Sequence, residues 1–240
     1  KNLPSGRFSF KENMKYFMCD TETSGLKIPE PPASGVCQVA YVELAYDEPA
    51  NEFFVVEQNM QYCNPGEPID PAASKVHGLY DEDVAEQPPL GEVFNLHGPL
   101  VFMAHNARFD YPRLKPHLKG EVEVFCTLNA ARKYLNAPDN KLTSLVSHYG
   151  LQEYDAHDAL GDVLMAAQVL NLLLSETKIP FKEMLVEQNK LVIPKTMPFG
   201  KFKGLSLHKL PPDYVRWLSE QDLEKGLRKG IELVAKTFGK

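Results

Sequence analysis

The chain has 240 residues, 43% of them hydrophobic and 24% charged, and its formal net charge at pH 7 is −6. A chain of this length can bury a sizeable core and exceeds the usual single-domain size, which predicts one large domain with an appendage. No apolar run approaches the ~20 residues of a membrane span, and residues 1–15 lack the apolar core of a signal peptide. We therefore expect a soluble globular protein of the cytoplasm.

The four cysteines are widely spaced and form no CxxC pair: Cys19, Cys37, Cys63 and Cys126. Neither a zinc site nor a disulfide framework is indicated by this spacing. We expect these thiols to be reduced and mostly buried.

Charge is distributed unevenly along the chain. Residues 1–177 hold 13 basic and 25 acidic residues, a formal charge of −12, whereas residues 178–240 hold 13 basic and 7 acidic residues, a formal charge of +6. An acidic body suits cations and a basic tail suits a polyanion, so the asymmetry favours a negatively charged partner. The alternative is a solvated basic surface without a partner.

The first third of the chain predicts strands. Residues 1–13 are polar and without periodicity, and we interpret them as a leader or remnant preceding Met14. A buried strand is expected over 15–20, before a Thr-Ser-Gly turn and a Pro-rich loop. Residues 36–46 and 51–58 are β-branched and aromatic, with turn-forming residues between them. These three segments predict an antiparallel meander.

Helices and strands then alternate. Acidic residues open two short predicted helices, over 70–77 and 81–85. The further predicted elements are strands over 100–104 and 122–126, and helices over 107–118, 127–135, 142–149 and 158–174. This alternation predicts an α/β sandwich.

Two carboxylates end the first strand. Residues i and i+2 of a strand point to the same face, so Asp20 and Glu22 can converge on one hard cation. Asp162 lies early in a predicted helix whose apolar stripe marks it as core. A carboxylate in the first turns of a helix is more often dipole-stabilising than a ligand, and that alternative stays open.

His157 directly precedes that helix. An ideal helix would place it roughly 140° around from Asp162, so it must act from the flanking turn. The alternative is a surface histidine without a catalytic role.

Three motifs in series carry a family resemblance. Asp20-x-Glu22, His105-Asn106-Ala107-x-Phe109-Asp110 and His157-x-Ala159-x-x-Asp162 resemble the histidine branch of the DEDD exonuclease superfamily. The resemblance covers roughly residues 14–177. Residues 197–204 and 210–218 resemble the FGKxKG module of exodeoxyribonuclease X-like members, to which residues 75–79 and 126–127 are also similar. Gln38 departs from the pattern, since many relatives carry Glu there.

The resemblance implies an α/β ribonuclease-H-like fold, a mixed five-stranded sheet flanked by helices, with a small basic C-terminal module. We expect an exonuclease domain over 14–177, a linker over 178–193 and the module over 194–240.

Phosphodiester hydrolysis requires hydroxide near neutral pH and stabilisation of charge on the phosphoryl and leaving oxygens, which two carboxylate-held cations about 3.5–4 Å apart can supply. The resemblance implies Asp20, Glu22, Asp110 and Asp162 as ligands of two Mg²⁺ ions, for which Mn²⁺ substitutes. Without cations these carboxylates should raise one another's pKa values. His157, with a reference pKa near 6.5, is the implied general base.

Substrate contacts are also implied by the resemblance. Thr21, Thr23 and Leu26 follow as contacts of the 3′ nucleotide, with Leu26 as an apolar wedge, while plain turn chemistry is the alternative for Thr23. The remaining implied contacts are His77 and Asn106 at the phosphate or sugar and Phe109 stacking nearby. We expect His105 to be a positioning residue with satisfied hydrogen bonds.

The tail has two interpretations. Residues 195–216 interleave five basic residues with Phe199, Phe202 and Tyr214, which suits DNA holding, whereas a protein-interaction cap is the alternative. Trp217 and Leu218 are expected to pack the small core.

The predicted function is metal-dependent 3′→5′ hydrolysis of single-stranded or duplex DNA to nucleoside 5′-monophosphates, in repair or degradation. An exoribonuclease or a polymerase proofreading exonuclease of the same branch is the alternative. A catalytically silent nucleic-acid-binding protein is the alternative from another class.

Overall fold

The structure, a computed structural model, describes residues 14–190, 193–221, 223 and 225–238. The proposed leader over 1–13 lies outside these residues. The chain divides into two compact units, an N-terminal unit, Lys1–Asn189, and a C-terminal unit, Lys190–Lys240.

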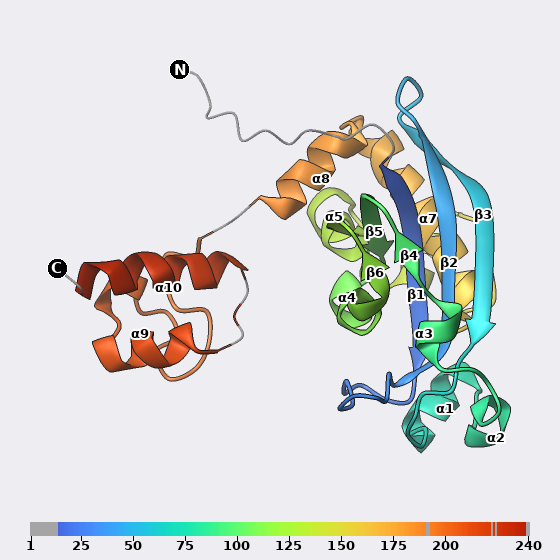
Figure 1. The fold of residues 1–240 in the computed structure, drawn as a ribbon. Coiled ribbons are helices and arrows are strands. Elements are labelled where there is room, and N and C mark those ends of the chain that lie inside the picture. The colour runs from blue at the N-terminus through green and yellow to red at the C-terminus, as the bar shows by residue number, and fades with distance from the viewer. Residues whose placement is uncertain (1–13, 191–192, 222, 224, 239–240) are drawn as a thin grey trace. The chain divides into compact units, whose positions relative to one another are not determined.

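A mixed five-stranded sheet forms the centre of the N-terminal unit (Figure 1). Its strands are β1 (Lys15–Thr23), β2 (Val36–Asp47), β3 (Glu52–Tyr62), β5 (Leu100–Ala104) and β7 (Val122–Cys126), in the order β3-β2-β1-β5-β7. β2 runs antiparallel to β1 and β3, whereas β5 runs parallel to β1 and β7. The expected sheet is therefore confirmed.

β1 is longer than expected, because it continues beyond Asp20 to Thr23. Pairing with β2 sustains it, since Asp20 lies opposite Ala40 and Glu22 opposite Gln38. Both carboxylates thus stand on paired backbone, and the register shifts only between Glu22 and Thr23.

Helices cover both faces of the sheet. One face carries α5 (Thr127–Tyr134), α6 (Leu142–His148), α7 (Ala159–Thr177) and α8 (Phe181–Asn189). The other carries α3 (Leu90–Val93), α4 (Ala107–Leu114) and a small parallel sheet of β4 (Leu96–His97) and β6 (Leu118–Lys119), which was not anticipated. The short helices α1 (Pro71–His77) and α2 (Asp81–Val84) lie beyond one end of the strands (Figure 1). The α/β sandwich is confirmed, and all four cysteines are free and buried as expected.

α4 stops at Leu114, earlier than the expected residue 118, and a 3₁₀ turn, η1 (Lys115–His117), follows. Pro116 in that turn lacks the N–H that a continuing helix would need.

α7 is the central helix of the core. Figure 1 shows it behind β1, β2 and β3, and its stripe of buried residues includes Val163, Leu170 and Leu174, as predicted. By length and composition alone α7 could cross a membrane, but 56% of that stretch is buried inside the protein. Burial against the sheet accounts for its apolar character.

The expected linker over 178–193 is wrong for the part that forms α8. Phe181, Met184 and Leu185 of this helix are buried in the main core, and the Phe181 ring meets the Phe53 ring edge-on at 4.8 Å. Apolar residues at i, i+3 and i+4 form one helical face, which the sheet covers.

The C-terminal unit has its own small core. Its elements are η2 (Leu207–Lys209), α9 (Pro212–Ser219) and α10 (Lys225–Phe238). The buried residues are Met197, Leu207, Leu210, Val215, Leu218, Leu227, Ile231 and Val234. Leu218 is buried as expected, but the expectation for Trp217 is wrong, because its side chain is 49% exposed. The core-facing positions of α9 are Val215 and Leu218, and Trp217 lies outside that stripe.

Candidate active site

The end of β1 faces the start of α7. Met18 packs in the core cluster that includes α7, and side chains two and four residues further along a strand share its face. Those residues are Asp20 and Glu22. A carboxylate oxygen of Glu22, a carboxylate oxygen of Asp162 and a ring nitrogen of His157 all lie within 4.8 Å of one another. The tertiary structure therefore brings together groups that are far apart in the sequence.

His157 approaches this group from the turn before α7, as expected. Its backbone is left-handed, with φ of 65°, and its side chain is exposed. A side chain at Gly161 would place its Cβ 2.2 Å from the Asp155 carbonyl oxygen, so glycine lets the turn fold onto the helix. The tight turn positions the imidazole beside Asp162.

Asp110 reaches the site from the first turn of α4 on the other face of the sheet. It is buried, and its Oδ1 accepts a hydrogen bond of 2.8 Å from the hydroxyl of Thr21. Asn106 is the N-cap of α4 and adopts a left-handed backbone with φ of 78°. This corner redirects the chain so that Asp110 faces the end of β1.

Burial raises the pKa of all four predicted ligands. It raises the pKa of Glu22 to about 8, with further repulsion from Asp162 and Asp110. Burial also raises the pKa of Asp110 to about 7, although the Thr21 hydrogen bond and Arg113 lower it. The pKa of Asp20 lies well above its ordinary value, through burial first and then repulsion from Asp110, Asp162 and Glu22.

Burial raises the pKa of Asp162 too, against the lowering effect of His157. The expected mutual repulsion raises the pKa values of Asp20 and Glu22, but loss of hydration is the largest cause at all four carboxylates. Such a group of oxygen donors is destabilised until positive charge arrives, and it fits a hard divalent cation.

A cavity of 350 Å³ adjoins the carboxylates. Four of the predicted substrate contacts line it, namely Thr23, Leu26, His77 and Phe109, together with Glu22 and Val76. Leu26 is 89% exposed on its turn, which suits an apolar wedge. The other two predicted contacts are not in this lining: the Thr21 hydroxyl donates to Asp110, and Asn106 occupies the N-cap position of α4 without a capping side-chain hydrogen bond.

His77 is fixed by backbone groups on both sides of its ring. Its Nδ1 accepts from the Leu79 amide at 3.1 Å, so Nε2 carries the proton and donates to the Thr23 carbonyl, also at 3.1 Å. Burial lowers the pKa of His77, which favours this neutral form. The ring ties α1 to the end of β1, and its contact with a phosphate stays a prediction.

His105 has satisfied hydrogen bonds, as expected. Its ring nitrogens lie 2.9 Å from the Thr127 hydroxyl and 2.9 Å from the Asn140 carbonyl oxygen. Burial lowers its pKa. The ring links β5 to α5 and belongs to the framework of the site.

Arg113 is a residue that the sequence analysis missed. The buried guanidinium donates through one nitrogen to the carbonyl oxygens of Gly25, Leu26 and Lys27, at 3.0 to 3.3 Å. It also lies 4.1 Å from the centre of the Phe109 ring. Arg113 therefore fixes both the turn that carries Leu26 and the ring opposite it. Its position three residues after Asp110, one helical turn away, was the available signal.

Gln38 anchors the start of α7, a role that its departure from the family pattern did not reveal. Its amide nitrogen donates to Asp158 at 2.8 Å, and its oxygen accepts from the Ala159 amide at 2.9 Å. Asp158 in turn caps the helix by accepting from the Gly161 amide. Because Gln38 lies opposite Glu22 in the sheet, this link holds Asp162 beside Glu22.

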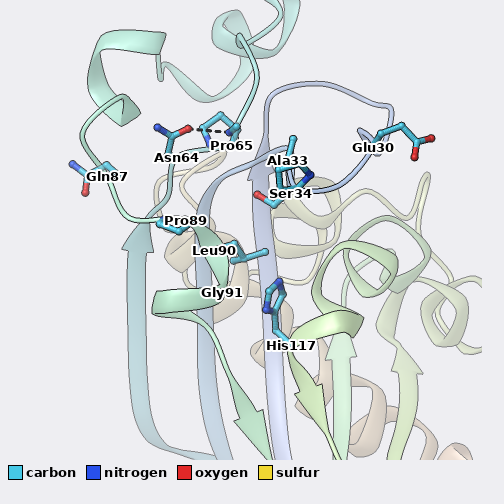
Figure 2. A pocket seen from close by; sticks show the side chains of 12 residues that line it. Glu30, Ala33, Ser34, Asn64, Pro65, Gln87, Pro89, Leu90, Gly91 and His117 are labelled. Atoms are coloured by element: carbon cyan, nitrogen blue, oxygen red, sulfur yellow. Dashed lines mark hydrogen bonds between the residues drawn. The ribbon is translucent and has the colours of Figure 1, made fainter.

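A larger cavity than the one beside the carboxylates lies elsewhere, with a volume of 530 Å³. Figure 2 shows it between the loop after β1, the segment at Asn64–Pro65 and the start of α3, with His117 pointing toward Gly91. None of the predicted site residues lines it. The larger cavity is therefore separate from the carboxylate cluster.

Comparison with known families agrees with this geometry. A family described as Exonuclease, RNase T, matches residues 17–170, and one described as a putative quorum-sensing-regulated virulence factor matches residues 186–233. Exodeoxyribonuclease 10 of Escherichia coli (strain K12) is 28% identical over 211 residues, covering 83% of this chain and 88% of that protein. DNA polymerase III subunit epsilon of Pasteurella multocida (strain Pm70) is 29% identical over 170 residues, 65% of this chain and 66% of that protein.

Solved structures share the fold. Exonuclease X in complex with 5′ overhanging duplex DNA superposes with a TM-score of 0.55 at 23% identity, covering 71% of this chain and 97% of that one. E. coli exonuclease I with a dT13 oligonucleotide gives a TM-score of 0.59 at 19% identity, covering 77% and 47%. Since the family match spans more than half of the sequence, the chain belongs to the RNase T family of DEDD exonucleases and is a 3′→5′ exonuclease.

Proposed function

We propose that this protein is a metal-dependent 3′→5′ exodeoxyribonuclease, which hydrolyses DNA from its 3′ end to nucleoside 5′-monophosphates. One observation carries the proposal: an imidazole, that of His157, lies within 4.8 Å of the carboxylates of Glu22 and Asp162. A silent binding protein would not require a base beside a partly dehydrated acidic cluster.

Membership of the family implies a divalent metal ion. We assign Asp20, Glu22, Asp110 and Asp162 as its ligands and propose two Mg²⁺ ions, since all-oxygen donor sets suit this cation. When bound, the metal supplies charge stabilisation to the phosphoryl and leaving oxygens and favours hydroxide at neutral pH.

His157 is the proposed general base. Its exposure gives water access to the imidazole, and the neighbouring Asp162 stabilises the cation that forms when the ring takes a proton from the attacking water. The left-handed turn fixes where the ring stands, so the base is positioned before substrate arrives.

The cavity beside the carboxylates is the proposed seat of the terminal nucleotide. Leu26, Val76 and Phe109 offer apolar surface to a base, while Glu22 stands at the end where the sugar and phosphate would lie. Arg113 holds two walls of this cavity at a fixed separation. We propose Thr23 and His77 as contacts of the sugar or phosphate.

DNA is favoured over RNA because the relatives include an exodeoxyribonuclease, and because solved neighbours carry single-stranded or duplex DNA. Likeness to DNA polymerase III subunit epsilon favours a proofreading role as a second candidate. The two candidate functions differ in whether hydrolysis depends on a polymerase. A free exonuclease should degrade both unpaired and correctly paired 3′ ends without a polymerase.

The test offers 5′-labelled single-stranded DNA, recessed and overhanging duplexes, and RNA of the same sequence, each with Mg²⁺ or EDTA. We expect progressive shortening from the 3′ end, release of nucleoside 5′-monophosphates and preference for DNA. Asp20→Ala should lower turnover on the order of 1,000-fold or more, because metal stabilisation contributes several kcal/mol. Glu57→Ala, at an exposed carboxylate of β3, is the control.

Preference for RNA would overturn the proposed substrate. Turnover that persists in Asp20→Ala would overturn the assigned site. Binding without any hydrolysis would favour the silent binding protein.

A further inference from the structure

Three aromatic rings of the C-terminal unit form a continuous row that leads from the edge of its core to the surface. Phe202 meets Tyr214 edge-on, with ring centres 4.6 Å apart, and Tyr214 stacks on Trp217 at 5.3 Å with only 24° between the ring planes. Trp217 is 49% exposed at the end of this row. We call Phe202, Tyr214 and Trp217 the aromatic row.

The row joins two segments of the chain. Residues 198–203 form a loop whose ends are closed by hydrogen bonds between Met197 and both Leu205 and Gly204, each 2.8 Å. Gly200 has a φ of 71°, and a Cβ there would lie 3.3 Å from the Tyr214 hydroxyl. Glycine thus permits the loop to approach α9 closely. The sequence motif FGKFKG therefore serves to dock Phe202 beside the outer face of this helix.

Phe202 and Tyr214 are partly buried against the hydrophobic core, whereas Trp217 lies outside it. Val215 and Leu218 of α9 are buried with Leu227, Ile231 and other core residues. Tyr214 and Trp217, three residues apart, share another face of the helix. The half-exposed Trp217 therefore presents an accessible aromatic face on which a ligand can stack.

Exposed basic side chains lie on the same two segments as the row. The Nζ of Lys201 lies 4.9 Å from the centre of the Phe202 ring, and Lys203 and Arg216 are exposed on the same two segments. Arg216 lies 3.7 Å from Asp213, but both side chains are more than three-quarters exposed, so this ion pair is weak. Residues 178–240 carry a formal charge of +6, which complements phosphate.

We propose that the aromatic row is a binding site for single-stranded DNA, with a base stacked on the exposed Trp217, which Tyr214 supports from behind, and phosphates held by Lys201, Lys203 and Arg216. An exposed ring with basic side chains on the same segments matches alternating bases and phosphates, and stacking requires unpaired bases. The choice of DNA rests on the proposed function. The alternative ligand, which the experiment must distinguish from DNA, is a protein partner.

Trp217 is the only tryptophan of the 240 residues, so its fluorescence reports the site directly. The full chain is titrated in EDTA with an unlabelled oligothymidylate, and binding is measured separately from the anisotropy of a labelled copy. We expect saturable quenching of Trp217 at the concentrations at which anisotropy rises. Oligonucleotide binding that leaves Trp217 emission unchanged would overturn the proposal and favour a protein partner.

Variants separate stacking from charge. Trp217→Phe should retain most of the affinity, whereas Trp217→Leu should weaken it about fivefold or more, because leucine offers no aromatic face. Lys201→Ala and Arg216→Ala should each reduce the magnitude of the slope of log K for DNA binding against log salt concentration by about 0.7. Lys236→Ala, an equal charge change on an exposed part of α10, should not. Equal affinities of the Phe and Leu variants would overturn the stacking.

This experiment stands apart from the test of hydrolysis, because EDTA prevents turnover and the probe lies in the other unit. Quenching without nuclease activity in Mg²⁺ would overturn the proposed function alone. Nuclease activity together with Trp217 fluorescence that does not change when the oligonucleotide binds would overturn only the proposed binding site.

Discussion

The two units of this protein place their functional groups in opposite environments. In the N-terminal unit, Glu22 and Asp110 are buried at the edge of a large α/β core, and their pKa values are raised. In the C-terminal unit, Trp217 and Arg216 stand exposed outside a small core. Chemistry requires groups that are fixed and partly stripped of water, whereas binding a flexible strand requires accessible rings and charges.

Only the N-terminal unit loses folding stability through the placement of its functional groups. Burying carboxylates destabilises the metal-free N-terminal unit, and its large core offsets that cost. A unit of about fifty residues has little stability to spare, so functional groups are more easily accommodated on its surface.

The largest expected effect concerns where the first unit ends. A chain cut after Thr177 loses the buried Phe181, Met184 and Leu185, at about 1.5–3 kcal/mol each, and should aggregate or melt far below the full chain. A chain cut after Asn189 should keep the melting transition of the N-terminal unit. Equal stability of the two truncations, measured by circular dichroism, would contradict the role of α8.

The second-largest expected effect comes from removing the proposed general base. His157→Ala is expected to lower kcat by about 10²–10⁴-fold while Mg²⁺ and DNA binding persist, because a positioned base contributes about that factor. Single-turnover kinetics and calorimetric titration measure the two properties. His148→Ala, at another exposed histidine, is the control. A wild-type rate would exclude His157 as the base.

Removing the metal should make the free energy of unfolding depend on pH through the raised pKa values of the carboxylates. The folded state binds protons more tightly than the unfolded state at Glu22, with a pKa of about 8 against 4.5, and at Asp110, with about 7 against 3.8. In EDTA the free energy of unfolding should therefore fall as pH rises from about 4 to about 8. Thermal melts should show Mg²⁺ raising Tm by about 5 °C at pH 8, equivalent to roughly 2 kcal/mol.

At pH 5.5 the same addition should change Tm little, because the carboxylates are protonated. Glu22→Gln should flatten the pH dependence in EDTA. An equal Mg²⁺ effect at both pH values would contradict the assignment of these groups.

The smallest expected effect is on the turn that carries Leu26. Arg113→Lys keeps the charge near Asp110 but loses the guanidinium contacts with three carbonyl oxygens, so KM should rise about tenfold, or about 1.4 kcal/mol, with kcat nearly unchanged. Arg108→Lys, at an exposed arginine of α4, is the control. A fall in kcat at constant KM would assign Arg113 to the chemistry instead.

The sequence by itself determined the elements whose signal is local. The two-residue alternation placed Asp20 and Glu22 on one face, and the helical stripe identified α7 as core, because these periods depend on backbone geometry alone. The three motifs also identified the family. The expectation of a mixed five-stranded sheet flanked by helices followed from that resemblance.

Only the tertiary structure decided which distant groups meet. It extended β1 to Thr23 through pairing with β2, packed α8 into the core, and joined Arg113 to the turn at Leu26. It also left Trp217 on the surface, which helical spacing could not assign to either side. These outcomes depend on contacts across dozens of residues, and local periodicity carries no information about partners so far along the chain.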